Sequence, residues 1–118
     1  MLVTKKASLI LILKILQEYT DEDHFLTQAQ IIEKISHQYN LELERKSVSS
    51  SLELLEELDY DIVKGPHGGY ALLTRTFDKT EASYLIDAIF SSRSINAKRA
   101  KEISNSIYSC LSKYERKD

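Results

Sequence analysis

The sequence is poor in the residues that interrupt regular structure. Its 118 residues include one proline and three glycines, and all four lie between positions 65 and 69. Because glycine and proline mark turns, their absence elsewhere predicts a mostly helical chain with one sharply turned loop. The single cysteine, Cys110, excludes an internal disulfide and a zinc site built from thiolates. No apolar run reaches the roughly 20 residues that a membrane-spanning helix requires.

What the sequence does contain is the composition of an ordinary globular domain. Hydrophobic residues make up 42% and charged residues 29%, which is enough to bury a core. The formal net charge is -2 at pH 7, whereas nucleic-acid-binding domains often carry a positive balance. Only the distribution of the charges can therefore indicate such a function. With one cysteine and no membrane span, a cytoplasmic location, at the bacterial nucleoid, is expected.

Hydrophobic spacing predicts three helices in the first 60 residues. The first covers residues 7–19 and is apolar on several sides. The second begins at Thr27, which forms a capping-box pattern with Gln30, and ends at Asn40, a residue type that tolerates the left-handed conformation. The third covers residues 45–58. This helix is predicted to bury one stripe, formed by Val48, Leu52 and Leu55. The opposite, exposed face carries Lys46, Ser50, Glu53 and Glu57.

A β-hairpin is predicted directly after the third helix. Residues 62–64 and 70–73 are short β-prone runs, and the glycine-rich and proline-containing residues 65–69 connect them. The order of helix, helix, helix and hairpin, with a tight turn between the second and third helices, is that of a winged helix-turn-helix. We therefore expect a winged helix-turn-helix domain over residues 1–75.

Residues 76–118 are predicted to form a helical segment that serves for dimerisation and as a linker. One helix starts near Asp78 or Thr80, and a last helix follows Asn96, a good N-cap residue. Apolar residues recur along this last helix at steps of three and four, which is typical of a coiled-coil seam. The predicted dimerisation residues are Ala100, Ile103, Ile107, Cys110, Leu111 and Tyr114. The fold class expected overall is mainly α with a small β-hairpin wing.

Three parts of the chain resemble the N-terminal DNA-binding portion of bacterial WYL-domain transcriptional regulators. They are residues 45–58 (RKSVSSSLELLEEL), residues 62–70 (IVKGPHGGY), and the region from residues 75–77 (RTF) to residues 90–92 (FSS). The resemblance implies that the third helix enters the major groove of DNA and that the hairpin touches the backbone. It also implies that the later helices assist dimerisation and lead to a ligand-sensing domain.

The sequence departs from that family in two respects. Ser50 and Ser51 stand where such regulators usually have an Arg-Asp pair, so one strong phosphate or guanine contact is missing. The sensing domain is absent from the 118 residues. Two interpretations remain open for this absence: the chain is one domain of a longer regulator, or it is a stand-alone protein without an effector response.

The predicted DNA-binding residues lie at the start of the third helix and on the hairpin. Lys46, Ser49 and Ser50 could read base edges, while Arg45 and Lys64 contact phosphates. The alternative is that the helix face is simply solvated and that the glycines serve the turn alone. The full predicted set is Arg45, Lys46, Ser47, Ser49, Ser50, Lys64, His67 and Gly68.

Other functions find little support in the residues. None of the serines lies in the strand-turn-helix motif of a nucleophile elbow, and no glycine-rich phosphate loop precedes a helix. The three histidines lack the spacing of metal ligands. We therefore expect no enzyme activity, no metal, no cofactor and no small-molecule ligand. The expected partners are double-stranded DNA and a second copy of the chain, with no membrane. The alternative function is a protein-binding inhibitor or adaptor that uses acidic residues 21–23, Glu53, Glu56 and Glu57.

Overall fold

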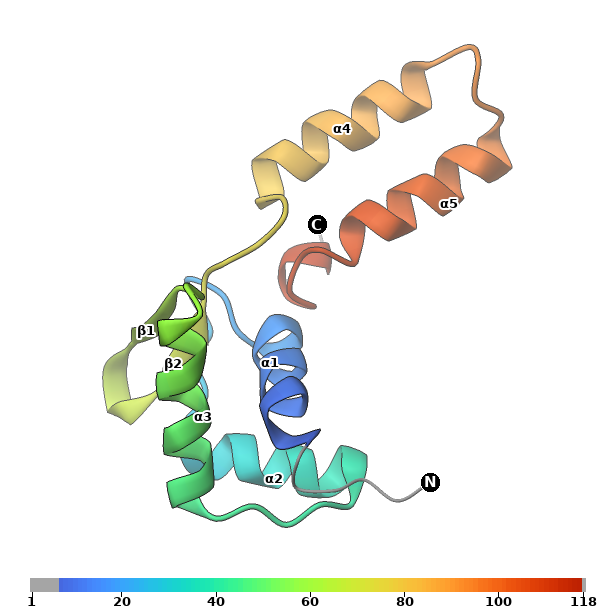
Figure 1. Ribbon diagram of the computed structural model, residues 1–118. Helices are drawn as coiled ribbons and strands as arrows, with labels where there is room; N and C mark the ends of the chain where they lie inside the picture. Colours follow the sequence, from blue (N-terminus) through green and yellow to red (C-terminus); the bar gives the residue numbers. More distant parts are fainter. Residues whose placement is uncertain (1–6, 118) are drawn as a thin grey trace. The chain divides into compact units, whose positions relative to one another are not determined.

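The computed structural model describes residues 7–117, which divide into two units. The first unit ends at Thr74 and the second begins at Arg75. Helices and one hairpin make up the first unit, and helices alone make up the second (Figure 1). The elements of the first unit are α1 (Ser8–Tyr19), α2 (Gln28–Tyr39), α3 (Arg45–Glu57), β1 (Ile62–Lys64), a single 3-10 turn (Pro66–Gly68) and β2 (Tyr70–Leu72).

The ends of α2 confirm the two signals predicted from the sequence. At its start, the Thr27 hydroxyl accepts a hydrogen bond from the Gln30 amide at 3.2 Å, and the Gln30 side chain accepts one from the Thr27 amide at 2.9 Å. This reciprocal pair satisfies backbone donors that a helix start otherwise leaves open. At its end, Asn40 adopts the left-handed conformation with φ 53°. Both ends are thus determined by residues in the helix or directly beside it.

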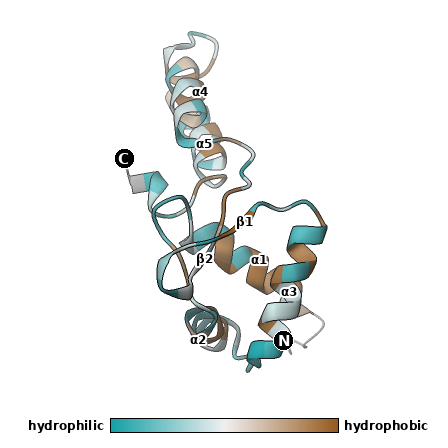
Figure 2. Cartoon of the chain, turned by 90° about the vertical axis from the view of Figure 1, so that its left-hand side faces the viewer, coloured by the Kyte–Doolittle hydropathy of each residue, from teal (hydrophilic) through white to brown (hydrophobic). Residues whose placement is uncertain are grey.

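The core of the first unit lies between α1, α2, α3 and β2. The predicted inner stripe of α3 is confirmed, because Val48, Leu52 and Leu55 retain at most 3% of their exposure. Figure 2 shows long brown, hydrophobic stretches along α1, which supplies the largest share of the core. Only Ile10 departs from the expectation of a helix buried on several sides, since it is 59% exposed on the outer side of α1. The fully buried large side chains of this unit include Ile12, Ile15, Leu16, Ile31, Ile35, Val48, Leu55 and Leu72.

The hairpin packs against two helices of the first unit. Its strands are antiparallel, with Ile62 opposite Leu72 and Lys64 opposite Tyr70. Strand β1 lies against α3 and β2 lies against α1. Strand β2 ends at Leu72, one residue before the end predicted from the sequence. Three helices followed by a hairpin give this unit a winged-helix topology, as the sequence predicts.

The second unit is a pair of helices that pack against each other (Figure 1). These are α4 (Lys79–Ser91) and α5 (Ala97–Tyr108), followed by a 3-10 turn (Glu115–Lys117). Asp78 caps α4 in a second capping box, and Asn96 caps α5 by accepting a hydrogen bond from the Arg99 amide at 2.8 Å. Both helix starts agree with the sequence prediction.

The last helix is shorter than a seam reaching Tyr114 requires. Helix α5 ends at Tyr108, so Cys110, Leu111 and Tyr114 follow the helix instead of continuing its stripe. At this end the Ser109 and Cys110 amides bond to carbonyls three or four residues back, and the chain then turns. The predicted coiled-coil seam over Ala100 to Tyr114 is therefore wrong beyond Tyr108. None of the helices within residues 7–117 combines the length and apolar character needed to cross a membrane.

Candidate nucleic-acid interface

The first half of α3 presents a polar and cationic surface. Arg45, Lys46 and Ser50 are exposed, and Ser49 is half-buried beside them. Their hydroxyl and amine groups belong to the first two turns of the helix, because α3 begins at Arg45. Residues in these turns are the ones that a helix-turn-helix places at base edges. Ser47 is half-buried, so it offers less surface than its neighbours.

The start of α2 is tied to this surface by a side-chain hydrogen bond. The Gln28 amide donates to the Ser49 hydroxyl at 2.8 Å, across 21 residues of sequence. Gln28 is the first residue of α2, and Thr27 before it is the N-cap. Because the Ser49 oxygen accepts this bond, its hydroxyl proton remains oriented away from Gln28. The bond therefore fixes the rotamer of one predicted base-reading residue.

The turn end of strand β2 is fastened to the loop that precedes α2. Leu26 and Tyr70 exchange both backbone hydrogen bonds, at 2.9 and 2.7 Å. The Phe25 side chain packs closely against both glycines that flank the turn. A β-carbon at Gly65 would lie 2.5 Å from the Phe25 ring, and one at Gly69 would lie 2.8 Å from the Phe25 β-carbon. Larger residues at these positions would displace Phe25, so the glycines permit this packing as well as the turn.

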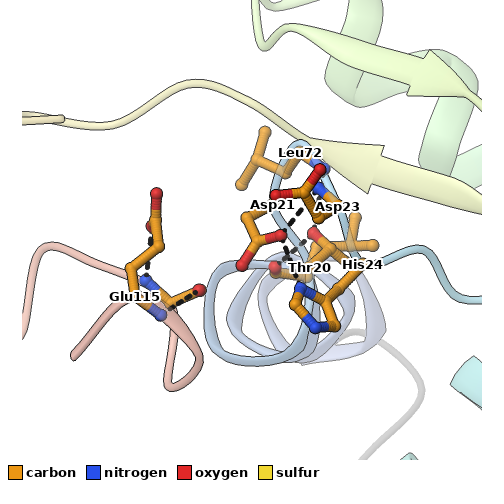
Figure 3. A network of polar contacts seen from close by, with 8 residues as sticks. Thr20, Asp21, Asp23, His24, Leu72 and Glu115 are labelled. Carbon is orange, nitrogen blue, oxygen red and sulfur yellow. Dashed lines mark hydrogen bonds and ion pairs between the residues drawn. The ribbon is translucent and has the colours of Figure 1, made fainter. Parts of the chain in front are cut away.

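A polar network fastens β2 to the end of α1 (Figure 3). The Thr20 hydroxyl is fully buried, donates to the Leu16 carbonyl at 2.6 Å and accepts from the Leu72 amide at 2.9 Å. Beside it, Asp21 accepts a hydrogen bond from the Asp23 amide at 2.9 Å and lies 2.7 Å from the His24 imidazole. These contacts close the loop between α1 and α2. The loop and the hairpin are thereby held as one piece with the helices of the first unit.

The tip of the hairpin carries two adjacent residues in the left-handed conformation. His67 has φ 60° and Gly68 has φ 73°, and both are exposed, as is Lys64 on the preceding strand. This conformation suits glycine but costs a residue such as histidine of the order of 1 kcal/mol. Residues held in such strain cluster at functional sites.

The start of α2, the start of α3 and the hairpin meet at an open hollow of about 440 Å³. Its lining residues come from the start of α2, the start of α3 and the tip of the hairpin, and they are Thr27, Gln28, Arg45, His67, Gly68 and Tyr70. Three predicted DNA-binding residues, Arg45, His67 and Gly68, are therefore brought together. The other five predicted residues do not line this hollow.

Sequence reasoning missed the remaining half of the lining. The capping box marks Thr27 as a helix start, and that signal could also have drawn attention to Gln28. Nothing local indicates Tyr70, Phe25 or Thr20, because their contacts join segments that are far apart in the sequence. These residues become visible only once the hairpin is placed against the helices.

The second half of α3 has the opposite character. Glu53, Glu56 and Glu57 are exposed there, and no basic side chain lies between them. Leu54 and Leu58 remain 41% and 55% exposed on the same half. Phosphates are repelled by such a surface, so any nucleic acid must approach α3 from its first half.

The predicted dimerisation residues, three on α5 and three after it, are all at least half-buried within the chain. Ala100 and Leu111 are buried, whereas Ile103, Ile107, Cys110 and Tyr114 are half-buried. Helix α4, by contrast, leaves large apolar side chains in solvent: Tyr84 is 74% exposed, Phe90 56% and Leu85 38%. The apolar surface left in solvent on this unit therefore belongs to α4 more than to α5.

Comparisons with known proteins assign the chain to no family and no function. No protein-family model, no curated protein and no solved structure matches the chain. The winged-helix topology is consistent with the resemblance to WYL-domain regulators, while membership of that family stays a prediction. Within residues 7–117, no three histidine, cysteine, aspartate or glutamate side chains gather in a way that could hold a metal ion.

Proposed function

We propose that the protein is a sequence-specific double-stranded DNA-binding transcriptional regulator. The carrying observation is the hollow where the start of α2, the start of α3 and the wing meet, because it joins Arg45 and His67 from two separate elements. The exposed polar turns of α3 lie next to it. In this proposal α3 enters the major groove and the wing lies along the phosphate backbone.

The negative net charge is compatible with this proposal because the charges are separated along the chain. Arg45 and Lys46 occupy one end of α3, and its glutamates occupy the other. DNA binding depends on the number of phosphates that basic side chains neutralise, not on the charge of the whole protein. The first half of α3 and Lys64 on the wing would supply these contacts.

Selection of bound duplexes from a random DNA pool, at two salt concentrations, tests the proposal. A regulator enriches one motif, and its affinity falls as salt rises, with a slope set by the number of phosphates contacted. Enrichment of no motif, together with no salt-sensitive binding at low ionic strength, contradicts the proposal. A scrambled duplex of equal length is the control for non-specific binding.

The second unit supports a further part of the proposal, a homodimer. The pair of helices α4 and α5 is small, and Tyr84, Leu85 and Phe90 of α4 stay exposed. Covering these side chains in a second copy would remove their apolar surface from water. Light scattering should give twice the mass of 13.6 kDa, and Leu85→Lys with Phe90→Lys should return it to that of a monomer. A monomeric mass for the unmodified chain contradicts dimerisation.

A protein-binding function is the second candidate. It is favoured by the second half of α3, where exposed Leu54 and Leu58 lie among three glutamates. Such a surface suits a partner segment that is both basic and apolar. Protein binding replaces DNA binding as the proposed function if two results are obtained. The random DNA pool yields no motif, and substitutions at Arg45 and Lys46 leave the protein's activity in cells unaltered.

A further inference from the structure

The open hollow has a chemistry that favours one kind of ligand. Among its lining residues, Arg45 and His67 are basic and none is acidic. Thr27 and Tyr70 are hydroxyl-bearing residues, and Gln28 carries an amide whose nitrogen donates to Ser49. Arginine presents a planar fork of donors that matches the oxygens of a phosphate, and hydroxyl and amide groups complete such a contact.

The basic groups of the hollow are available to a ligand. Within residues 7–117, neither Arg45 nor His67 engages in an ion pair or a side-chain hydrogen bond. Both side chains are exposed, so the guanidinium of Arg45 and the imidazole of His67 face solvent. An anion entering the hollow would therefore meet these groups without having to break an existing contact.

The shape of the hollow favours a phosphate carried on a chain. A volume of about 440 Å³ is larger than one phosphate group, and the hollow is open to solvent instead of enclosed. A free ion would be loosely held in such a space, whereas a nucleic-acid backbone can pass through it with one phosphate inside. We propose that the hollow seats a single backbone phosphate of duplex DNA, held between α2, α3 and the wing; this rests on the proposed function.

The seated phosphate would also determine how α3 lies on the bases. Gln28 lines the hollow and, through its amide, holds the Ser49 hydroxyl at 2.8 Å. One residue thus touches both the phosphate seat and the base-reading surface. Gln28 is a positioning residue in this inference, because it acts on the bases through Ser49.

Neutral phosphate substitution tests the seat directly. In the duplex recovered by selection, each phosphate is replaced in turn by an uncharged methylphosphonate, and affinity is measured for the full chain and for Arg45→Gln. For the unmodified chain we expect one position in each half-site where replacement lowers affinity by about tenfold. In Arg45→Gln, replacement at that same position should cost less than about twofold, since the charge partner is already gone.

Two further variants complete the experiment. Lys14→Gln removes an exposed cation from α1, outside the hollow, and should retain the full methylphosphonate penalty. Gln28→Ala should relax the preference for the base nearest Ser49 while melting at the temperature of the unmodified chain. A merely structural role for Gln28 would lower the melting temperature and leave the base preference unchanged.

The outcomes separate this inference from the proposed function. If the unmodified chain binds DNA but Arg45→Gln keeps every methylphosphonate penalty, the seat is overturned and the function stands. If inorganic phosphate alone shifts the amide resonances of Gln28 and Gly68 at low millimolar concentration while no methylphosphonate position matters, the hollow serves a free anion and the inference is again overturned. If the unmodified chain binds no duplex, both the function and the seat are overturned.

Discussion

The two halves of α3 share one inner stripe but differ on their outer surface. The first half exposes Arg45, Lys46 and Ser50, whereas the second exposes glutamates with Leu54, and Leu58 is exposed directly after it. Packing against α1 and α2 requires only the stripe, so the outer surface is free to differ from turn to turn. The comparison teaches that one buried stripe can carry two outer surfaces of opposite charge on the same helix.

The largest effect on stability is expected from substitutions in the buried stripe that both halves of α3 share. Leu52 is 3% exposed and Leu54, two residues away, is 41% exposed. Leu52→Ala should lower the free energy of unfolding by about 2–5 kcal/mol, because it leaves a cavity in the core. Leu54→Ala should lower it by less than about 1 kcal/mol. Chemical denaturation of both variants measures the difference, and equal losses would contradict the orientation of α3.

Charge changes on the outer surface test the comparison itself. Lys46→Glu adds an acidic group to the cationic half, so we expect DNA affinity to fall by roughly ten- to a hundredfold. Glu53→Lys removes repulsion on the acidic half and should leave affinity unchanged or raise it slightly. Binding measured by fluorescence anisotropy over a salt series decides the matter. An equal loss in both variants would show that the two halves do not differ in function.

Strand β2 of the wing is fastened to the end of α1 by the buried Thr20 hydroxyl. Thr20→Val removes the hydroxyl that accepts from the Leu72 amide and leaves that buried donor without this partner. We expect a loss of about 1–3 kcal/mol in the free energy of unfolding. Thr20→Ser keeps the hydroxyl and serves as the control. A thermal melt in which valine is tolerated as well as serine would argue against this fastening.

The smallest effect is expected at the tip of the wing. His67 and Gly68 both have positive φ, and a β-carbon added at Gly68 would meet no atom within 4 Å. His67→Gly should therefore raise the free energy of unfolding by about 0.5–1 kcal/mol, whereas Gly68→Ala should lower it by a similar amount. The same His67 variant should bind DNA more weakly, because it loses the imidazole. Higher stability without any loss of DNA binding would mean that the His67 imidazole makes no contact with DNA.

Much of the local structure could be predicted from short-range patterns. The capping box at Thr27 and Gln30, the left-handed stop at Asn40 and the stripe of Val48, Leu52 and Leu55 each depend on residues within a few positions of one another. Helix α5 is the exception, since apolar residues continue at helical spacing to Tyr114 although the helix ends at Tyr108. A pattern of apolar residues shows what can be buried on one face, but the chain still turns after Tyr108.

By itself, the sequence determined where the helices begin, which faces of them are buried and where the hairpin turns. Caps, periodicity and glycine act through bonds and angles within one or two turns, so these features need no distant partner. Tertiary structure alone decided that Phe25 fills the space between Gly65 and Gly69, and that Gln28 reaches Ser49. It also decided that Arg45 and His67 share one hollow. These contacts join segments separated by some 20 to 50 residues, and only the packing of the core brings such segments together.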